Sequence, residues 1–181
     1  LLIGAHLGSF EVLRAVGRGQ QGLKVAMMMY EDNARKINAT LEAINPAATQ
    51  DIIPLGRMDS MLQARDKLDE GYLVGMLADR GLGDDATVDC DFLGKPAPFP
   101  LGPFRMAAML RRPVFFMTGL YLGGNRYQLH FEPIADFSQT TREERDTAIH
   151  AAMQHYADRL THYCRLAPYN WFNFFDFWQK K

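Results

Sequence analysis

A histidine and a glutamate near the start of the chain are the residues whose types and spacing could do chemistry. His6 follows the apolar run 1–5, four residues separate it from Glu11, and a helix-like pattern begins near Phe10. We expect a strand that ends at His6 and a helix whose first turns hold Glu11, so that the turn between them brings the two side chains together. A carboxylate beside an imidazole holds one ring tautomer and stabilises the protonated ring. That arrangement makes the histidine an effective general base near neutral pH.

A structural role is the alternative for this pair. His6 can pack at a strand end, and Glu11 can be a favourable charge near a helix N-terminus. Two features favour function: Gly4 and Gly8 flank the histidine, and open α/β sheets bind ligands at the carboxyl ends of their strands.

The elements that must position this pair follow from hydrophobic periodicity. Apolar runs at 23–29, 51–55 and 72–78 predict buried strands, and the stretches 37–44 and 60–68 have helical spacing. The alternation predicts an α/β fold with a central mixed, largely parallel sheet and helices on both faces. In the second half, the runs 113–121 and 127–134 predict a hairpin, and a capping-box pattern at 140–144 begins a helix with one core-facing stripe.

Asp79 and Arg80 end the third of these apolar runs. In a parallel sheet their strand end lies at the same edge as His6, so we expect them near the histidine. One interpretation is that they line a ligand pocket, with Arg80 contacting an anionic group. The other is an ion pair that only fixes the loop.

Phe92 to Pro103 is rich in proline and predicts a rigid loop that enters a helix at Pro103. The N-terminus of such a helix offers unpaired N–H groups and a partial positive charge. We therefore expect Lys95, Gly102 and Arg105 to bind a phosphate or the anionic part of a carrier. A rigid connector with two solvated cations is the alternative.

The densest aromatic segment is 169–178. Helical spacing would place four of its side chains on one face, namely Trp171, Phe174, Phe175 and Trp178. That face can cover the core of the domain, or it can dock on a membrane interface, where tryptophan is favoured and Lys180 and Lys181 meet anionic lipid.

The composition excludes several classes of function. The 181 residues are 48% hydrophobic, which predicts a single domain over residues 1–181 with a substantial core. A net charge of -1 argues against a nucleic-acid partner. Cys90 and Cys164 have no disulfide-framework or zinc spacing, and the acidic stretch 84–91 lacks the calcium-loop spacing, so no metal is expected.

The sequence contains no apolar run of the roughly 18 residues that cross a bilayer, and no signal peptide. It starts without methionine and already inside an apparent strand. We expect upstream residues in the full protein.

Three blocks of the sequence resemble the lysophospholipid acyltransferase superfamily, and within it the lipid A biosynthesis (lauroyl/myristoyl) acyltransferase branch. The blocks are Gly4-Ala5-His6-Leu7-Gly8-Ser9-Phe10-Glu11, then Gly75-Met76-Leu77-Ala78-Asp79-Arg80-Gly81, and then Phe92-Leu93-Gly94-Lys95-Pro96-Ala97 leading to Pro100-Leu101-Gly102. Their joint occurrence in this order is much more specific than any one of them. The chain departs from the branch at Arg80, where the lipid A enzymes usually have glutamine, and this puts the identity of the acyl acceptor in doubt.

The resemblance implies an acyltransferase that uses no cofactor. Its HX4E histidine would be the general base for transfer of a fatty acyl group from an acyl thioester, on acyl carrier protein or coenzyme A, to a hydroxyl of a lipid or glycolipid. It also implies a membrane surface as partner, at the cytoplasmic face of the bacterial inner membrane, with peripheral attachment or a preceding anchor.

We therefore expect His6 to accept the proton of the hydroxyl while Glu11 orients the ring. No acyl-enzyme is expected, because no Gly-x-Ser-x-Gly elbow surrounds Ser9. The amides of Gly8 and Ser9, or Arg80, are candidates to bind the oxyanion. Arg57 is a further candidate contact to an anionic acceptor. A thioesterase and a non-catalytic lipid-binding domain remain the alternatives.

Overall fold

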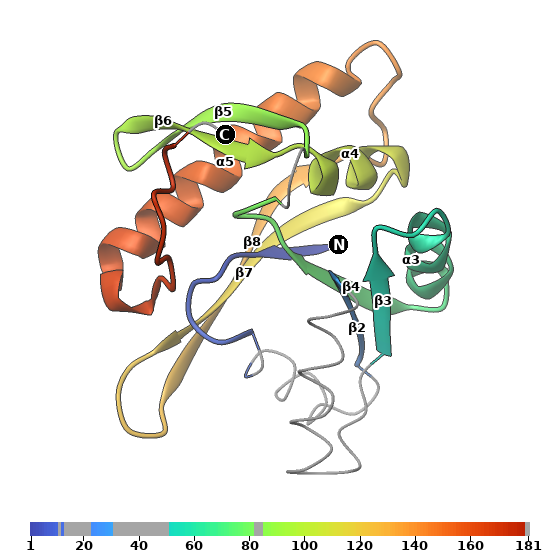
Figure 1. The fold of residues 1–181 in the computed structure, drawn as a ribbon. Coiled ribbons are helices and arrows are strands. Elements are labelled where there is room, and N and C mark those ends of the chain that lie inside the picture. The colour runs from blue at the N-terminus through green and yellow to red at the C-terminus, as the bar shows by residue number, and fades with distance from the viewer. Residues whose placement is uncertain (11, 13–22, 31–50, 82–84, 180–181) are drawn as a thin grey trace. The chain divides into compact units, whose positions relative to one another are not determined.

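The computed structural model describes residues 1–10, 12, 23–30, 51–81 and 85–179 (Figure 1). Its elements are β1 (Leu2–Gly4), β2 (Lys24–Tyr30), β3 (Asp51–Leu55), α3 (Ser60–Asp69), β4 (Tyr72–Leu77), β5 (Thr87–Phe92), β6 (Lys95–Pro100), α4 (Gly102–Met109), β7 (Pro113–Tyr121), β8 (Tyr127–Asp136), α5 (Arg145–Leu166) and the short 3-10 helix η2 (Pro168–Asn170). They divide into two compact units, Leu1–Leu13 with Leu77–Lys181, and Arg14–Met76. The single domain predicted from the sequence stays a prediction.

Six strands form one sheet in the order β3-β2-β4-β1-β7-β8. β2 is parallel to β3 and to β4, β1 is parallel to β7, and β7 and β8 are antiparallel. Strands β5 and β6 form a separate two-stranded sheet. The predicted α/β class, with a mixed and largely parallel sheet, is therefore confirmed.

The unit Arg14–Met76 contains the predicted strand-helix-strand succession. Buried methionines fill the centre of β2, because a strand inside a parallel sheet is covered on both faces. β3 accommodates Pro54 because it is the edge strand of the sheet. The helix that the sequence predicts at 37–44 lies outside the described residues, as does the first helix after Phe10.

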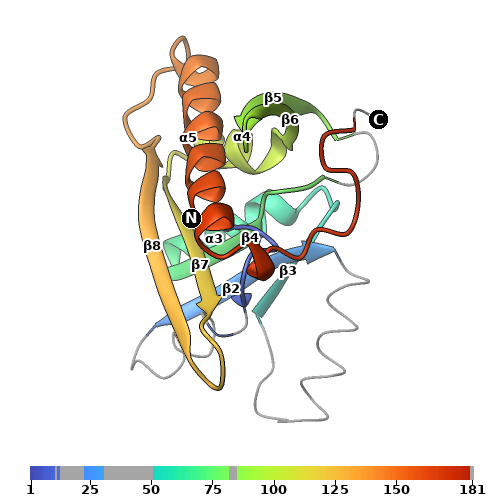
Figure 2. The same cartoon turned by 90° about the vertical axis from the view of Figure 1, so that its left-hand side faces the viewer.

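Tyr156 of α5 lies at the centre of the other unit. Its ring packs edge-on against Phe99 of β6 and Phe104 of α4 and tilts against Phe116 of β7. Its hydroxyl donates a hydrogen bond of 2.8 Å to the carbonyl of Gly4 at the end of β1. One fully buried side chain thus connects α5 with three other elements and with the strand that precedes His6. Figure 2 shows α5 running alongside β7 and β8.

The start of α5 confirms the predicted capping box, a few residues before the helix proper. The Thr141 hydroxyl donates 2.7 Å to the Glu144 carboxylate, and the Glu144 amide donates 3.3 Å to the Thr141 hydroxyl. The predicted core-facing stripe is buried, with Ile149, Ala152, Met153, Tyr156, Leu160 and Tyr163 each at most 2% exposed.

The proline-rich stretch after Phe92 is not the loop that the sequence predicts. Residues Lys95–Pro100 form β6, which pairs with β5 across a two-residue turn. The prolines occupy alternate positions of β6, and alternate N–H groups of a strand point to the same side. Their missing N–H groups therefore fall on the side of β6 that has no partner strand, and pairing with β5 is retained.

The predicted aromatic helix at the C-terminus is also wrong. After η2, residues 171–178 form no further helix. Backbone groups that a helix would use internally bond instead to the segment around His6. The Gly8 amide donates to the Asn170 carbonyl, and the Phe172 amide donates to the His6 carbonyl, both at 2.8 Å.

The C-terminal aromatic side chains divide between core and surface. Phe177 is buried against Phe92, with ring centroids 5.1 Å apart. Tyr169 and Phe174 are 97% and 89% exposed. Core cover is thus confirmed for Phe177, and docking of the segment on a membrane stays a prediction. Among the described helices, none is long and apolar enough to cross a membrane.

Candidate active site

His6 and Asp79 form the centre of the candidate site. His6 lies two residues after the end of β1, and Asp79 lies two residues after the end of β4. The Ala78 amide donates 3.0 Å to the Gly4 carbonyl, which holds the two strand ends together. Nδ1 of His6 is 2.9 Å from Oδ1 of Asp79. The sequence prediction that both residues lie at one sheet edge is therefore correct.

The two partners differ sharply in their exposure to solvent. The side chain of Asp79 is 1% exposed, whereas that of His6 is 37% exposed. Within the described part of the chain, Oδ2 of Asp79 has no hydrogen-bond partner. The buried carboxylate can hold one edge of the ring while the rest of the imidazole remains reachable, which is the arrangement that a general base needs.

Two weakly acidic groups that interact with the charge of Asp79, the Tyr156 hydroxyl and the Cys164 thiol, are buried and have raised pKa values. Burial raises the pKa of the Tyr156 hydroxyl, and the Asp79 charge raises it further. Burial and, secondarily, the Asp79 charge also raise the pKa of the Cys164 thiol to about 12. Among the described residues, the shortest polar contact of the Asp79 carboxylate is therefore the one to the ring of His6.

Arg80 contacts the same ring nitrogen as Asp79. Its Nε is 3.0 Å from Nδ1 of His6 and 3.8 Å from Oδ2 of Asp79. Its Nη2 donates 3.0 Å to the carbonyl of Phe172, and its Cζ lies 5.3 Å from the centroid of the Phe175 ring. The guanidinium thus connects the histidine to the C-terminal segment, and its side chain stays 31% exposed.

The loop that carries His6 is fixed by backbone contacts. The Ser9 amide donates 2.8 Å to the Gly119 carbonyl, and the Thr118 hydroxyl donates 2.8 Å to the Leu7 carbonyl. The amides of Gly8 and Ser9 are both used in this way, so they are not the oxyanion donors that the sequence suggested. Nε and Nη2 of Arg80, the third candidate, are likewise engaged, by His6 and by the Phe172 carbonyl.

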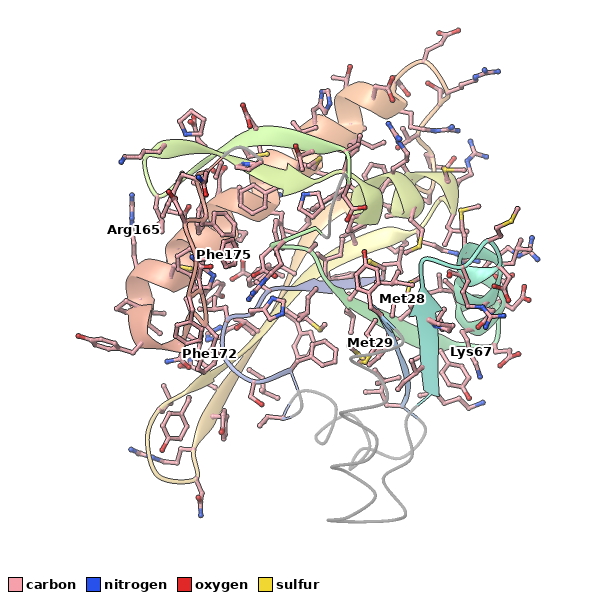
Figure 3. All side chains as sticks on the ribbon, in the orientation of Figure 1. Met28, Met29, Lys67, Arg165, Phe172 and Phe175 are labelled. Carbon is pink, nitrogen blue, oxygen red and sulfur yellow. The ribbon has the colours of Figure 1, made fainter. Side chains whose placement is uncertain are left out.

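The C-terminal segment pairs with this loop on its other side. Leu7 forms an isolated bridge with Trp171, and the Asn170 side chain accepts 2.7 Å from the Tyr121 amide. Figure 3 shows Phe172 and Phe175 on this segment, beyond the end of α5 that carries Arg165. Sequence reasoning missed this contribution, because the aromatic spacing indicated a helix. Asn170, a polar residue next to the aromatic run, was the available signal that this segment makes specific hydrogen bonds.

The predicted anion site at the start of α4 is only partly assembled. Gly102 and the exposed Arg105 lie in the first turn, and Pro103 occupies the predicted position there. Lys95 instead lies at the turn between β5 and β6, at the opposite end of β6 from α4 (Figure 1). Six strand residues span about 20 Å. Lys95 therefore does not flank the helix start, contrary to the prediction.

Two other predicted residues are not joined to this centre by any described contact. Arg57 belongs to the unit Arg14–Met76, is exposed, and pairs with Asp59 at 3.2 Å. Glu11 lies outside the described residues, and its predicted contact with His6 stays a prediction.

The side chains that could act as covalent nucleophiles are poorly suited to that role. Burial raises the pKa of the Cys90 thiol to about 11, and Cys164 is shielded in the same way. The Ser9 hydroxyl accepts a hydrogen bond of 3.3 Å from the Val12 amide. No cluster of three potential metal ligands occurs in the described ranges.

Comparison with known proteins identifies the family of the chain. A search of curated proteins gave no match. The model of a protein family described as bacterial lipid A biosynthesis acyltransferase matches residues 1–180, nearly the whole chain. The chain belongs to this family and is an acyltransferase.

Proposed function

We propose that this enzyme moves a fatty acyl group from an acyl thioester to a hydroxyl of a lipid or glycolipid, with His6 as general base and without an acyl-enzyme. Acyl carrier protein or coenzyme A carries the acyl group. The observation that carries the proposal is the contact of 2.9 Å between the partly exposed His6 and the buried Asp79.

The reaction then follows from the chemistry of this pair. Nδ1–H of His6 donates to Asp79, which leaves the lone pair on Nε2 free to accept a proton. The substrate oxygen attacks the thioester carbon as its proton moves to Nε2. The tetrahedral intermediate collapses, the carbon–sulfur bond breaks, and the leaving thiolate takes the proton from Nε2. The ring returns to its starting state.

The charge on Asp79 has two roles in this scheme. It fixes the tautomer that leaves Nε2 unprotonated, and it stabilises the imidazolium that forms during attack. We assign it this orienting role in place of the predicted contact to the acyl acceptor, because its carboxylate is buried. Glu11, the acid of the HX4E motif, also orients the ring in this proposal, and Glu11→Gln tests whether it adds to the effect of Asp79.

The other predicted residues contact substrate in this proposal. Arg80 binds an anionic group of the acyl acceptor, and Gly102 and Arg105 bind the anionic part of the donor at the start of α4. Arg57 is a separate proposed contact to an anionic acceptor. Lys95, at the β5–β6 turn, can meet only a large donor such as acyl carrier protein. Arg105→Ala should raise KM for the donor more than Lys95→Ala does when the donor is acyl-coenzyme A.

The direct test replaces the base and compares it with an exposed histidine. His6→Gln should lower acyl transfer by about a hundredfold or more, as loss of a general base does. His150→Gln, on the exposed side of α5, should leave it unchanged. Circular dichroism checks that both variants are folded. Full transfer by His6→Gln excludes the proposal. Release of free fatty acid as fast as acyl transfer, whether or not an acceptor is present, would indicate a thioesterase instead.

We also propose that exposed aromatic residues near the site dock on the cytoplasmic face of the bacterial inner membrane. Phe172 and Phe175 are about half exposed, and Phe174 and Tyr169 almost fully. Tyrosine is favoured at the depth of the lipid headgroups, and phenylalanine side chains insert at the boundary between headgroups and acyl chains. Docking there would bring a lipid substrate to the contact between Arg80 and Phe175.

Vesicle binding tests this docking. Phe172→Ser with Phe174→Ser should reduce cosedimentation with vesicles of phosphatidylglycerol and phosphatidylethanolamine. Phe131→Ser is the matched control, because Phe131 is 52% exposed on β8. Equal binding by all these variants would rule out a role for the aromatic segment.

A further inference from the structure

We propose that Arg80 is a positioning residue that sets the tautomer of His6, and that an anionic group of the substrate releases the histidine to act as a base. The inference rests on the proposed function, in which His6 is the base. It starts from two contacts at one atom. Nδ1 of His6 lies 2.9 Å from Oδ1 of Asp79 and 3.0 Å from Nε of Arg80.

These two contacts require opposite states of the nitrogen. Nε of arginine only donates, so Nδ1 must carry a lone pair to accept from Arg80. A carboxylate only accepts, so Nδ1 must carry a proton to bond with Asp79. A neutral imidazole has one proton on its two nitrogens. Contact with Arg80 therefore places the proton on Nε2, and contact with Asp79 places it on Nδ1.

Only one of these states can take a proton from a hydroxyl. With the proton on Nε2, the nitrogen that faces the substrate has no lone pair, and the base is blocked. With the proton on Nδ1, Nε2 is free. The change releases one proton from Nε2 and adds one at Nδ1, so the ring stays neutral. Solvent can carry the proton because the His6 side chain is 37% exposed.

The C-terminal segment holds Arg80 in the blocking position. Nη2 of Arg80 donates to the Phe172 carbonyl, and the face of the guanidinium lies over the Phe175 ring. A guanidinium is planar, so contacts at Nη2 and at its face also fix the direction of Nε–H. The pairing of Arg80 with Nδ1 is therefore a built geometry with three described contacts.

An anion is the chemical group that can draw Arg80 away from the ring. Phosphate and carboxylate bind guanidinium in a bidentate manner, which occupies Nε together with an Nη atom. The Arg80 side chain is 31% exposed and thus available to such a group. An anion shifts the equilibrium because it binds the released Arg80 better than the paired one. The base is then formed when an anionic acceptor is present, which limits loss of the acyl group to water.

Nitrogen NMR of the His6 ring tests this inference, with inorganic phosphate as the probe. The spectra are recorded at about pH 8.5, above the pKa of an ordinary imidazole, and the two neutral tautomers of an imidazole have distinct nitrogen shifts. The free wild-type enzyme should show Nε2 protonated, and phosphate should shift the signals toward the Nδ1-protonated form. Arg80→Met should show the Nδ1-protonated form without phosphate. Arg165→Met removes an exposed arginine of α5 and should behave as wild type.

A hydrolysis assay provides an independent measurement. Release of free fatty acid from an acyl thioester, without acceptor, should rise about tenfold in Arg80→Met, since a minor competent tautomer becomes the major one. Phosphate should raise hydrolysis in the wild type and leave Arg80→Met unaffected.

The outcomes separate this inference from the proposed function. A free wild-type enzyme with Nδ1 already protonated and no response to phosphate overturns the role of Arg80, even if His6→Gln abolishes transfer. Transfer by His6→Gln overturns the base assignment, whatever the tautomer. The phosphate titration of the wild type needs no variant, so the inference stays testable if Arg80→Met does not fold.

Discussion

The carboxylate of Asp79 contacts the ring of His6 at 2.9 Å, although 73 positions separate the two residues in the sequence. Each follows a strand of the same sheet, and the backbone bond between Ala78 and Gly4 fixes the spacing of these strand ends. The acid is buried while the base is partly exposed. Burial weakens the competition of water for the carboxylate, and so strengthens its bond to the ring once Nδ1 carries the proton.

Asp79→Asn should lower kcat for acyl transfer by about a hundredfold or more, with little change in KM. The asparagine is of similar size, but its amide can donate to Nδ1 and stabilise the wrong tautomer, and it gives the imidazolium no charge. Steady-state kinetics of transfer measure the change. Asp66→Asn, on the exposed side of α3, is the control. A kcat close to that of the wild type would show that another group orients the ring.

Gly8→Ala should abolish activity and strongly destabilise the loop that carries His6. Gly8 has φ +71°, and a Cβ there would lie 2.2 Å from the Gly119 carbonyl oxygen. Gly124→Ala is a matched control, because Gly124 has φ +59° but an added Cβ would meet nothing within 4 Å. The control should cost only about 1 kcal/mol of unfolding free energy. Equal losses in the two variants, measured by denaturant unfolding, would refute the steric argument.

The position of the candidate site could be predicted because it depends on a repeated local pattern. Apolar runs that end in polar residues predict parallel strands, and the carboxyl ends of such strands meet at one edge. The sequence pattern therefore predicts that His6 and Asp79 lie together. It could not tell which acid contacts the ring, because that depends on the relative position of two strand ends.

The two wrong secondary-structure predictions concern segments whose conformation is set by pairing with distant parts of the chain and not by their own sequence. Helical spacing predicted a helix around Trp171, but the backbone there bonds to the loop of His6, and local spacing carries no information about that partner. Proline content predicted a loop at 95–100, but strand β6 has only one neighbour and tolerates prolines on its free side. The prediction that Lys95 and Arg105 flank one helix start is wrong for the same reason, because an extended strand separates them where a loop was expected.

Phe177→Ala should lower the unfolding free energy by about 3 kcal/mol, because it removes a buried ring near the chain end. Phe177 packs against Phe92, Phe99 and Trp171, with centroids 5.1 to 5.5 Å away. Phe174→Ala, at an 89% exposed position of the same segment, should change it by less than about 0.5 kcal/mol. Denaturant unfolding compares them. Similar values for both would mean that the segment does not cover the core.

Cys164→Ala should flatten the loss of stability at high pH. Burial, with a smaller effect of the Asp79 charge, raises the pKa of this thiol from 9.0 to about 12. The unfolded chain therefore releases the proton first, and the unfolding free energy falls as the pH rises from 9 towards 12, by up to about 1 kcal/mol per unit. Denaturant unfolding of wild type and variant across this range measures the difference in slope. Tyr156 contributes in the same direction in both proteins and cancels in the comparison. Parallel slopes would show that the thiol ionises as easily in the folded protein as in the unfolded chain.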